Sequence, residues 1–320
     1  MTVLKHLRNF LFGMAFTATA LAQGYPAKPI RLVVPFPAGG SVDMVARMVG
    51  KRLGENLGQP VIVDNRAGAS GNIGMDFVAK APGDGYTLLM ASAAMTANSH
   101  LYAKMSFDPL KDLQPVIRVA DQPNVLVVNP RLGVKTVPDL IALAKSKPGK
   151  LTFGSAGLGA AQQIAAEIFM MKTGTKMLHV PYKGGAPALQ DLVGGQIDLM
   201  FETSPTAVPF VQSGKLVPLA VTTPNRLSTL PDLPTVAEAG VPGYEAYTWL
   251  GVVAPAGTPR EIVAKLNAEV KKIMTPEFRK ELTQINLIPV GDSPEEFSAF
   301  VRRDSDMYAR IVKDAHIDPQ

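Results

Sequence analysis

The chain passes from strand to helix in the stretch Ile30-Arg31-Leu32-Val33-Val34-Pro35-Phe36-Pro37-Ala38-Gly39-Gly40-Ser41-Val42-Asp43. Its first five residues form a short apolar run typical of a buried strand, and Pro35 to Ser41 read as a turn. Apolar residues then recur at the spacing of a helix at Val42, Val45, Ala46, Val49, Leu53 and Leu57. Gly39 and Gly40 would let a ligand approach the free N–H groups at the helix start, which favours a bound carboxylate or phosphate.

Nucleotide binding has little support at this turn. The Lys-Ser/Thr pair of a phosphate-binding loop does not follow Gly40, and the spacing G-x-G-x-x-G is absent. On this stretch alone, an ordinary strand-to-helix turn with Ser41 or Asp43 as the helix cap is an equally good interpretation.

The rest of the chain alternates in the same way. Strand-like runs lie at 61–63, 86–90, 125–128, 151–153, 177–180 and 249–253, and helical spacing is found at 72–79, 162–171, 260–274 and 294–312. This order predicts an α/β fold with a mostly parallel sheet in each half. Proline-rich segments near 121–123 and 223–242 suggest two crossings between two lobes. We expect lobe one to comprise residues 23–122 plus 226–320, and lobe two residues 123–225.

Three further junctions carry Gly or Ser at the end of a strand. They are Ser155 to Gln163, Tyr182 to Pro187, and Ala91 to Thr96. The first misses both the dinucleotide fingerprint and the G-x-S-x-G elbow of serine hydrolases. Because ligands of open α/β sheets settle outside the carboxyl ends of the strands, these loops predict one cleft between the lobes.

Composition excludes several classes of function. The 320 residues contain no Cys, which rules out disulfides, thiolate metal sites and Cys nucleophiles, and the four His residues lack metal-ligand spacing. The chain is weakly basic, with a net charge of +5, but has no clustered basic stripe with interleaved aromatic residues, so nucleic acid is not expected as a partner. We expect no metal, no cofactor and no catalytic residue.

The first 22 residues read as a signal peptide. Lys5 and Arg8 supply a basic start, Leu11 to Leu21 an apolar core, and Ala20-Leu21-Ala22 a cleavage site. The apolar run is shorter than the roughly 20 residues that span a bilayer, which disfavours the alternative of a membrane anchor. The sequence therefore predicts a periplasmic protein.

Beyond these patterns, the sequence resembles the receptors of tripartite tricarboxylate transporters, also called the Bug family. The likeness spans nearly the whole chain after residue 22. Besides the opening stretch, it is carried by Val61-Ile62-Val63-Asp64-Asn65-Arg66-Ala67-Gly68, Ala81-Pro82-Gly83-Asp84-Gly85-Tyr86, His179-Val180-Pro181-Tyr182-Lys183-Gly184, Gly194-Gly195-Gln196-Ile197-Asp198, Leu233-Pro234-Thr235-Val236 and Ala254-Pro255-Ala256-Gly257-Thr258-Pro259.

The resemblance implies a two-lobed, type II-like periplasmic binding protein that closes on a small organic acid. It implies that the first loop holds one ligand carboxylate through backbone N–H groups, with Phe36 packed on the ligand. Water bridges would help to hold the rest of the ligand. The candidate ligand-binding residues are Phe36, Ala38, Gly39, Gly40, Ser41, Asp43, Ser92, Thr96, Ser155, Ala160, Gln163, Tyr182 and Glu202.

The resemblance further implies that the protein delivers a mono- or dicarboxylate, or an aromatic acid, to the membrane permease subunits of a tripartite tricarboxylate transporter. We expect a monomer, because a cleft within one molecule needs no second chain. Two alternatives stay open on the sequence. One is a periplasmic sensor that presents its ligand to a membrane signalling protein. The other is a hydrolase that uses a carboxylate pair drawn from Asp43, Asp198 and Glu202.

Overall fold

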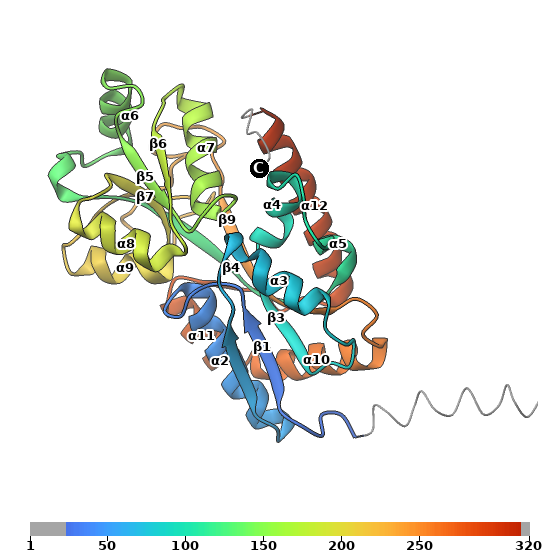
Figure 1. Ribbon diagram of the computed structural model, residues 1–320. Helices are drawn as coiled ribbons and strands as arrows, with labels where there is room; N and C mark the ends of the chain where they lie inside the picture. The colour runs from blue at the N-terminus through green and yellow to red at the C-terminus, as the bar shows by residue number, and fades with distance from the viewer. Residues whose placement is uncertain (1–23, 315–320) are drawn as a thin grey trace, which may run out of the picture.

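The computed structural model describes residues 24–314, and the predicted signal peptide at 1–22 lies outside these residues. The described chain is an α/β protein of two lobes, joined by long strands that run through the middle of the molecule (Figure 1). None of the helices between residues 24 and 314 combines the length and the apolar character that a membrane span requires.

The first lobe is built on one sheet, which contains the strand of the opening stretch. Its strands are β1 (Ile30–Val34), β2 (Val61–Asn65), β3 (Thr87–Ser92), β9 (Tyr247–Pro255), the first part of β4 (Leu113–Val128) and the short β10 (Ile288–Pro289). The helical segments of this part of the chain are α2 (Ser41–Leu57), η1 (Ala69–Gly71), α3 (Asn72–Ala79), α4 (Ala94–Leu101), α5 (Pro109–Asp112), α10 (Arg260–Ile273), α11 (Pro276–Gln284) and α12 (Pro294–Asp314).

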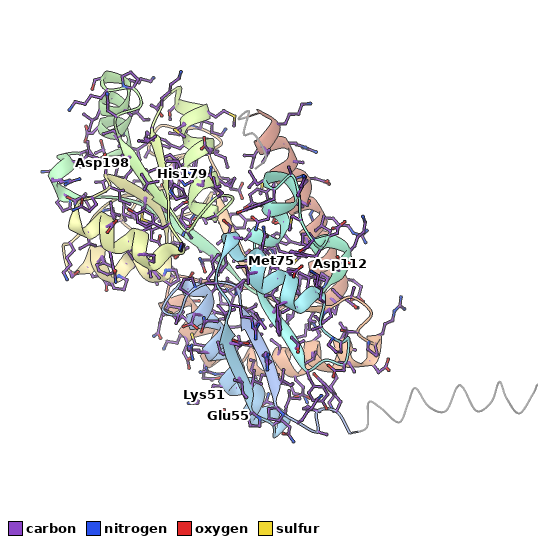
Figure 2. The ribbon with its side chains drawn as sticks, in the orientation of Figure 1. Lys51, Glu55, Met75, Asp112, His179 and Asp198 are labelled. Atoms are coloured by element: carbon purple, nitrogen blue, oxygen red, sulfur yellow. The ribbon has the colours of Figure 1, made fainter. Side chains whose placement is uncertain are left out.

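The second lobe is built on the sheet that the later part of β4 enters. Its other strands are β5 (Thr152–Ser155), β6 (Leu178–Pro181), β7 (Leu199–Thr203) and β8 (Val217–Val221). The helical segments here are η2 (Pro130–Leu132), α6 (Val137–Ser146), α7 (Ala161–Thr173), α8 (Gly185–Gly194) and α9 (Ser204–Gln212). His179 and Asp198 lie in this lobe, whereas Met75 and Asp112 lie in the other (Figure 2).

The sheets are mixed, which corrects the expectation of mostly parallel sheets. Strands β1, β2 and β3 pair in parallel, as do β5, β6 and β7, in agreement with strand-helix-strand crossovers. Strands β4 and β9 pair antiparallel with each other and with β7 and β3, respectively. The reason is that both strands pass between the lobes, β4 towards the second lobe and β9 back to the first. Each therefore runs antiparallel to the strands beside it.

The predicted elements are otherwise confirmed with small shifts of their ends. The helix expected at 72–79 is α3 itself, and the run expected at 125–128 is the last part of the longer β4. Strand β4 changes sheets at Pro123 and Asn124, and β8 and β9 lie on either side of the proline-rich segment that includes residue 225. The lobe boundaries at 122/123 and 225/226 stay a prediction.

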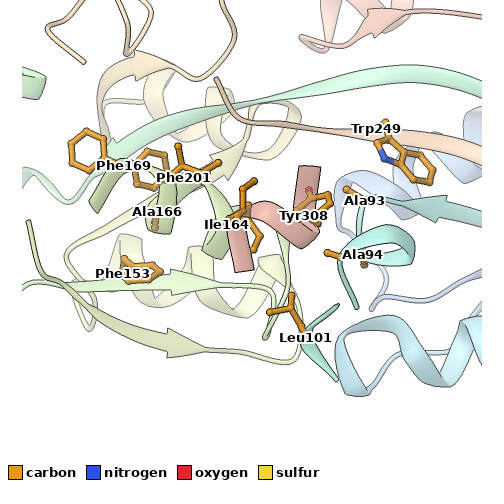
Figure 3. Packing of buried hydrophobic residues seen from close by; sticks show 14 of the residues in the cluster. Ala93, Ala94, Leu101, Phe153, Ile164, Ala166, Phe169, Phe201, Trp249 and Tyr308 are labelled. Carbon is orange, nitrogen blue, oxygen red and sulfur yellow. The ribbon is translucent and has the colours of Figure 1, made fainter. Parts of the chain in front are cut away.

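One apolar core runs from one lobe into the other. Phe153, Phe169 and Phe201 of the second lobe belong to the same buried cluster as Trp249 and Tyr308 of the first. Figure 3 shows Ile164 and Tyr308 between the phenylalanines on one side and Ala93 and Ala94 on the other. In this structure, the shared core packs the two lobes against each other.

Candidate functional site

A cavity lies between the lobes at the carboxyl ends of the strands. The space between its walls amounts to about 660 Å³, open solvent at its mouth included. Its wall contains the first residues of five helices, which are Gly40, Ser41 and Val42 of α2, Ala94 of α4, Ala160, Ala161 and Gln162 of α7, Gly185 and Ala186 of α8, and Thr203 and Thr206 of α9. The remaining wall residues are Phe36, Pro37, Ser92, Gln122, Ala156, Glu202, Thr248 and Leu250.

These five helices share one feature at their N-termini, which is that no side chain caps them. The first N–H groups of a helix have no partner within the helix, and the helix dipole adds a partial positive charge there. A capping side chain normally accepts one of these hydrogen bonds. Without such a cap, the N–H groups and their charge remain available to an anion in the cavity.

Among the described residues, the cavity wall contains no Lys, Arg or His. An anion bound there would therefore be held by neutral donors, namely backbone N–H groups, hydroxyls and amides. No group of His, Cys, Asp and Glu within residues 24–314 has the arrangement of a metal site. The chemistry that this cavity supports is binding by hydrogen bonds in a largely apolar surrounding.

The loop before α2 is held in shape by Asp43, which lies behind it. The Asp43 carboxylate accepts hydrogen bonds from the backbone N–H of Gly39 (3.0 Å), from Arg47 (2.9 and 3.0 Å) and from the amide of Asn65 (2.9 Å). Burial by itself raises the pKa of Asp43, but these hydrogen bonds outweigh it and hold the pKa below its ordinary value. Asp43 thus shapes the loop that presents Phe36 and Gly40, and does not itself reach the cavity.

Loops of the two lobes meet at the cavity and leave no room for side chains at two glycines. A Cβ placed on Gly184 would lie 2.9 Å from two ring carbons of Pro37, and one on Gly157 would lie 2.7 Å from the Ser70 hydroxyl. Both glycines also have positive φ angles, which other residues rarely adopt. Glycine at these positions therefore allows the loops of the two lobes to approach each other this closely.

Within residues 24–314, Glu202 is the one acidic side chain in the cavity wall, and it is buried. Its Oε1 accepts hydrogen bonds from the hydroxyls of Thr203 (2.9 Å) and Thr206 (2.5 Å), whereas Oε2 has only a long contact of 3.5 Å with the Gln162 amide. Burial raises the pKa of Glu202 more than these hydrogen bonds lower it. An uncapped start of α8 lies beside it, since a Cβ on Gly185 would be 3.4 Å from Oε1.

Gln122 adds an unsatisfied polar group to the same wall. Its side chain is buried, and its Oε1 has no hydrogen-bond partner within the protein. Buried polar atoms nearly always have a partner, so Gln122 Oε1 is available in the wall to a hydrogen-bond donor.

The structure brings some of the predicted site residues together and separates others. Those that line the cavity are Phe36, Gly40, Ser41, Ser92, Ala160 and Glu202. Ala38 and Gly39 are exposed on the first loop. The other five, away from the cavity wall, make internal hydrogen bonds: Asp43 as above, Thr96 to Asp304 (2.6 Å), Ser155 to His179 (2.6 Å), Gln163 to the N–H of Gly159 (2.8 Å) and Tyr182 to Asp191 (2.7 Å).

Ser155 and His179 have the residue types of a nucleophile and a base, a combination separate from the carboxylate pair considered for a hydrolase. Ser155 is completely buried, and its hydroxyl also contacts the carbonyl oxygen and the N–H of Gly157. His179 stacks on Phe153, and burial lowers its pKa to about 4. Because neither side chain reaches the cavity, the pair fixes the start of the loop before α7 instead of meeting a substrate.

Sequence reasoning missed several wall residues. Gln122, Thr248 and Leu250 come from the two strands that pass between the lobes, and no local pattern marks them. Gln162, Gly185 and Ala186 lie in junctions that the sequence did single out, so their helix-start positions could have identified them.

Comparison with known proteins agrees with this geometry. The model of the tripartite tricarboxylate transporter family receptors matches residues 45–317. The chain is 37% identical to protein BugT of Bordetella pertussis over 308 residues, which cover 95% of this chain and 94% of BugT. It is 41% identical to the structure of R. palustris Rpa4515 with adipate, at a TM-score of 0.90 and with 92% and 100% of the two chains covered. Likewise, it is 31% identical to MatC of Rhodopseudomonas palustris with bound malate, at a TM-score of 0.85 and with 90% and 100% covered.

Proposed function

This chain belongs to the family of tripartite tricarboxylate transporter receptors, and on that premise we propose that it binds a small organic acid between its two lobes and delivers it to membrane transporter subunits. The observation that carries the proposal is the convergence of five uncapped helix N-termini on one cavity. Such an arrangement recognises the carboxylate group itself and does not need an Arg or Lys partner.

The class of ligand follows from the apolar and the hydrogen-bonding parts of the cavity wall. Phe36 and Leu250, together with several alanines, offer apolar surface, whereas the helix starts and Gln122 offer hydrogen bonds. A carboxylic acid with an apolar body meets both requirements. The relatives Rpa4515 and MatC have structures with adipate and malate, so a dicarboxylate is the first candidate. Monocarboxylates and aromatic acids belong in the same screen.

The proposal also covers the location and the oligomeric state of the receptor. We expect a periplasmic monomer, because one chain encloses the whole cavity and the start of the sequence has the pattern of a signal peptide. Ligand contacts from both lobes would stabilise the closed form only by what they add beyond the open form. The closed form is then the one that membrane subunits would recognise.

A thermal-shift screen of residues 23–320 tests the proposal. The panel contains adipate, malate, succinate, hexanoate, benzoate, amino acids and uncharged amides of similar size. A ligand at 100 times its Kd stabilises the folded state by about 2.7 kcal/mol, which is readily measured. We expect shifts with carboxylates and none with the amides. No shift with any acid, after removal of co-purified ligand by unfolding and refolding, would contradict the proposal.

A further inference from the structure

The presence of Glu202 in the cavity is not explained by carboxylate binding alone. It places an acid in the wall of a cavity that we assign to an anion. An ionised Glu202 would repel a carboxylate brought within hydrogen-bond distance. Two carboxyl groups that share one site hold a proton between them, as like charges at that distance do not both ionise.

We propose that Glu202 is a neutral carboxylic acid in the complex and donates a hydrogen bond from Oε2 to the second carboxylate of a dicarboxylate ligand, so that binding takes up one proton. This inference rests on the proposed function. It assigns Glu202 as the residue that distinguishes a dicarboxylate from a monocarboxylate.

The hydrogen bonds of Glu202 agree with a proton on Oε2. Both threonine hydroxyls, of Thr203 and Thr206, are at Oε1, the oxygen that accepts in a neutral acid. Oε2 has only the long contact of 3.5 Å with Gln162, whose amide can present either its nitrogen or its oxygen. Oε2 is therefore the oxygen left for a ligand.

Among the described residues, no positively charged side chain is hydrogen-bonded to Glu202 or lines the cavity beside it, and only the partial charges of the α8 and α9 N-termini favour its ionised form. The groups that face it from α7, α8 and α9 are Gln162, Gly185 and the two threonines, and Val125 lies opposite it on β4. The charged residues of α7, of α8 and of the loop before α8 do not line the cavity; they are Glu167, Lys172, Asp191 and Lys183. Burial also raises the pKa of Glu202 in the protein by itself, which makes uptake of a proton easier.

Proton uptake is measured directly by titration calorimetry in buffers that differ in ionisation enthalpy. The probe is adipate, and hexanoate is the matched acid that lacks the second carboxylate. Measurements run from about pH 6 upward, where simple carboxylic acids with pKa values near 4 are already ionised. Between the pKa of Glu202 in the free protein and its pKa in the complex, we expect adipate affinity to fall by up to about ten-fold for each unit by which the pH rises. In the same pH range, binding of adipate should take up one proton. Hexanoate should bind with no proton uptake.

Two variants test whether Glu202 is the group that takes up the proton. Glu202→Gln keeps a hydrogen-bond donor without a titrating group, so it should bind adipate with an affinity that does not change with pH. Glu167→Gln is the matched control, because burial also raises the pKa of Glu167 but its side chain lies outside the cavity. It should keep the wild-type pH dependence.

The outcomes separate this inference from the proposed function. Adipate binding by the wild-type protein without proton uptake at any pH would overturn the inference and leave the receptor function standing. Loss of adipate binding in Glu202→Gln, or an unchanged pH dependence in that variant, would also overturn it. If the wild-type protein binds no acid of the panel at any pH, the proposed function itself fails.

Discussion

Helices that face the cavity differ at their N-termini from helices on the outside of the molecule. The cavity helices α2, α4, α7, α8 and α9 have no capping side chain. Outside, α5, α6 and α11 are capped by Asp108, Thr136 and Thr275, and Ser293 and Glu296 exchange the same hydrogen bonds at the start of α12. Two helices away from the cavity, α3 and α10, also lack a side-chain cap, and they follow a short turn and Pro259, respectively.

The difference agrees with the proposed anion site at the cavity. A cap stabilises a helix by satisfying its first N–H groups from within the chain. Leaving five neighbouring helices uncapped gives up that stabilisation, and a bound carboxylate can restore it. In the proposed site, the lack of capping side chains at the helix starts therefore matters as much as the side chains that are present.

The largest expected effect comes from giving α2 the cap that it lacks. Gly40 has backbone angles that suit a capping residue, and a Cβ there would meet only the carbonyl oxygen of Pro37, at 3.8 Å. Gly40→Asp should cap α2 and place its own carboxylate where the ligand would bind. We expect the protein to stay as stable as the wild type and carboxylate affinity to fall by more than about 100-fold, or about 2.7 kcal/mol.

Gly40→Asn separates the two causes of that loss. It caps the helix without adding charge, so it should weaken binding less than Gly40→Asp. Calorimetric affinities and urea unfolding of both variants provide the measurement. Wild-type affinity in Gly40→Asp would refute the assignment of α2 to the anion site.

Removal of the Asp43 carboxylate should affect both regions of the comparison, because it supports a cavity loop from behind. Asp43→Ala leaves the N–H of Gly39 and the Asn65 amide without their partner. We expect a loss of about 1–3 kcal/mol in the free energy of unfolding and a roughly ten-fold weaker affinity. Urea unfolding and calorimetry measure the two effects, and an unchanged affinity would show that the loop keeps its shape without Asp43.

The contribution of the Asp43 carboxylate to the free energy of unfolding should decrease in acid. Because the folded protein holds this pKa below its ordinary value, the carboxylate contributes stability above about pH 4 and loses it as the pH falls through the lowered pKa. The stability difference between the wild type and Asp43→Ala should therefore shrink in acid. A difference that stays constant down to about pH 2 would contradict this reading.

An outer cap should matter for stability alone. Thr136 and Asp139 exchange hydrogen bonds at the exposed start of α6, far from the cavity wall. Thr136→Ala should lower the free energy of unfolding by about 1 kcal/mol and leave ligand affinity unchanged. Weaker ligand binding in this variant would contradict the expectation that caps outside the cavity affect stability alone.

The smallest effect is expected at His179, which holds the uncapped α7 loop through Ser155. Its pKa of about 4 in the folded protein lies below the value near 6.5 of an unfolded chain. The unfolded state therefore binds a proton first as the pH falls, and stability drops by less than about 1 kcal/mol between about pH 7 and about pH 6. His179→Gln should remove that part of the pH dependence, which urea unfolding at the two pH values measures. An equal slope in both proteins would contradict the assignment.

Sequence patterns were sufficient to predict the α/β alternation, the glycine-bearing helix starts and the family. These features are local or are carried by ordered motifs, so neighbouring residues suffice to reveal them, as for β1, α2 and α3. The first loop with Phe36 and Gly40 was found for the same reason.

Which polar groups line the cavity could not be predicted from the sequence. Asp43, Thr96, Ser155, Gln163 and Tyr182 have the chemistry of binding residues, yet each is engaged in hydrogen bonds within the protein. Conversely, Gln122 and Thr248 reach the cavity because β4 and β9 pass between the lobes in opposite directions. A side chain's partner depends on contacts between residues far apart in the chain, and a local pattern carries no record of them.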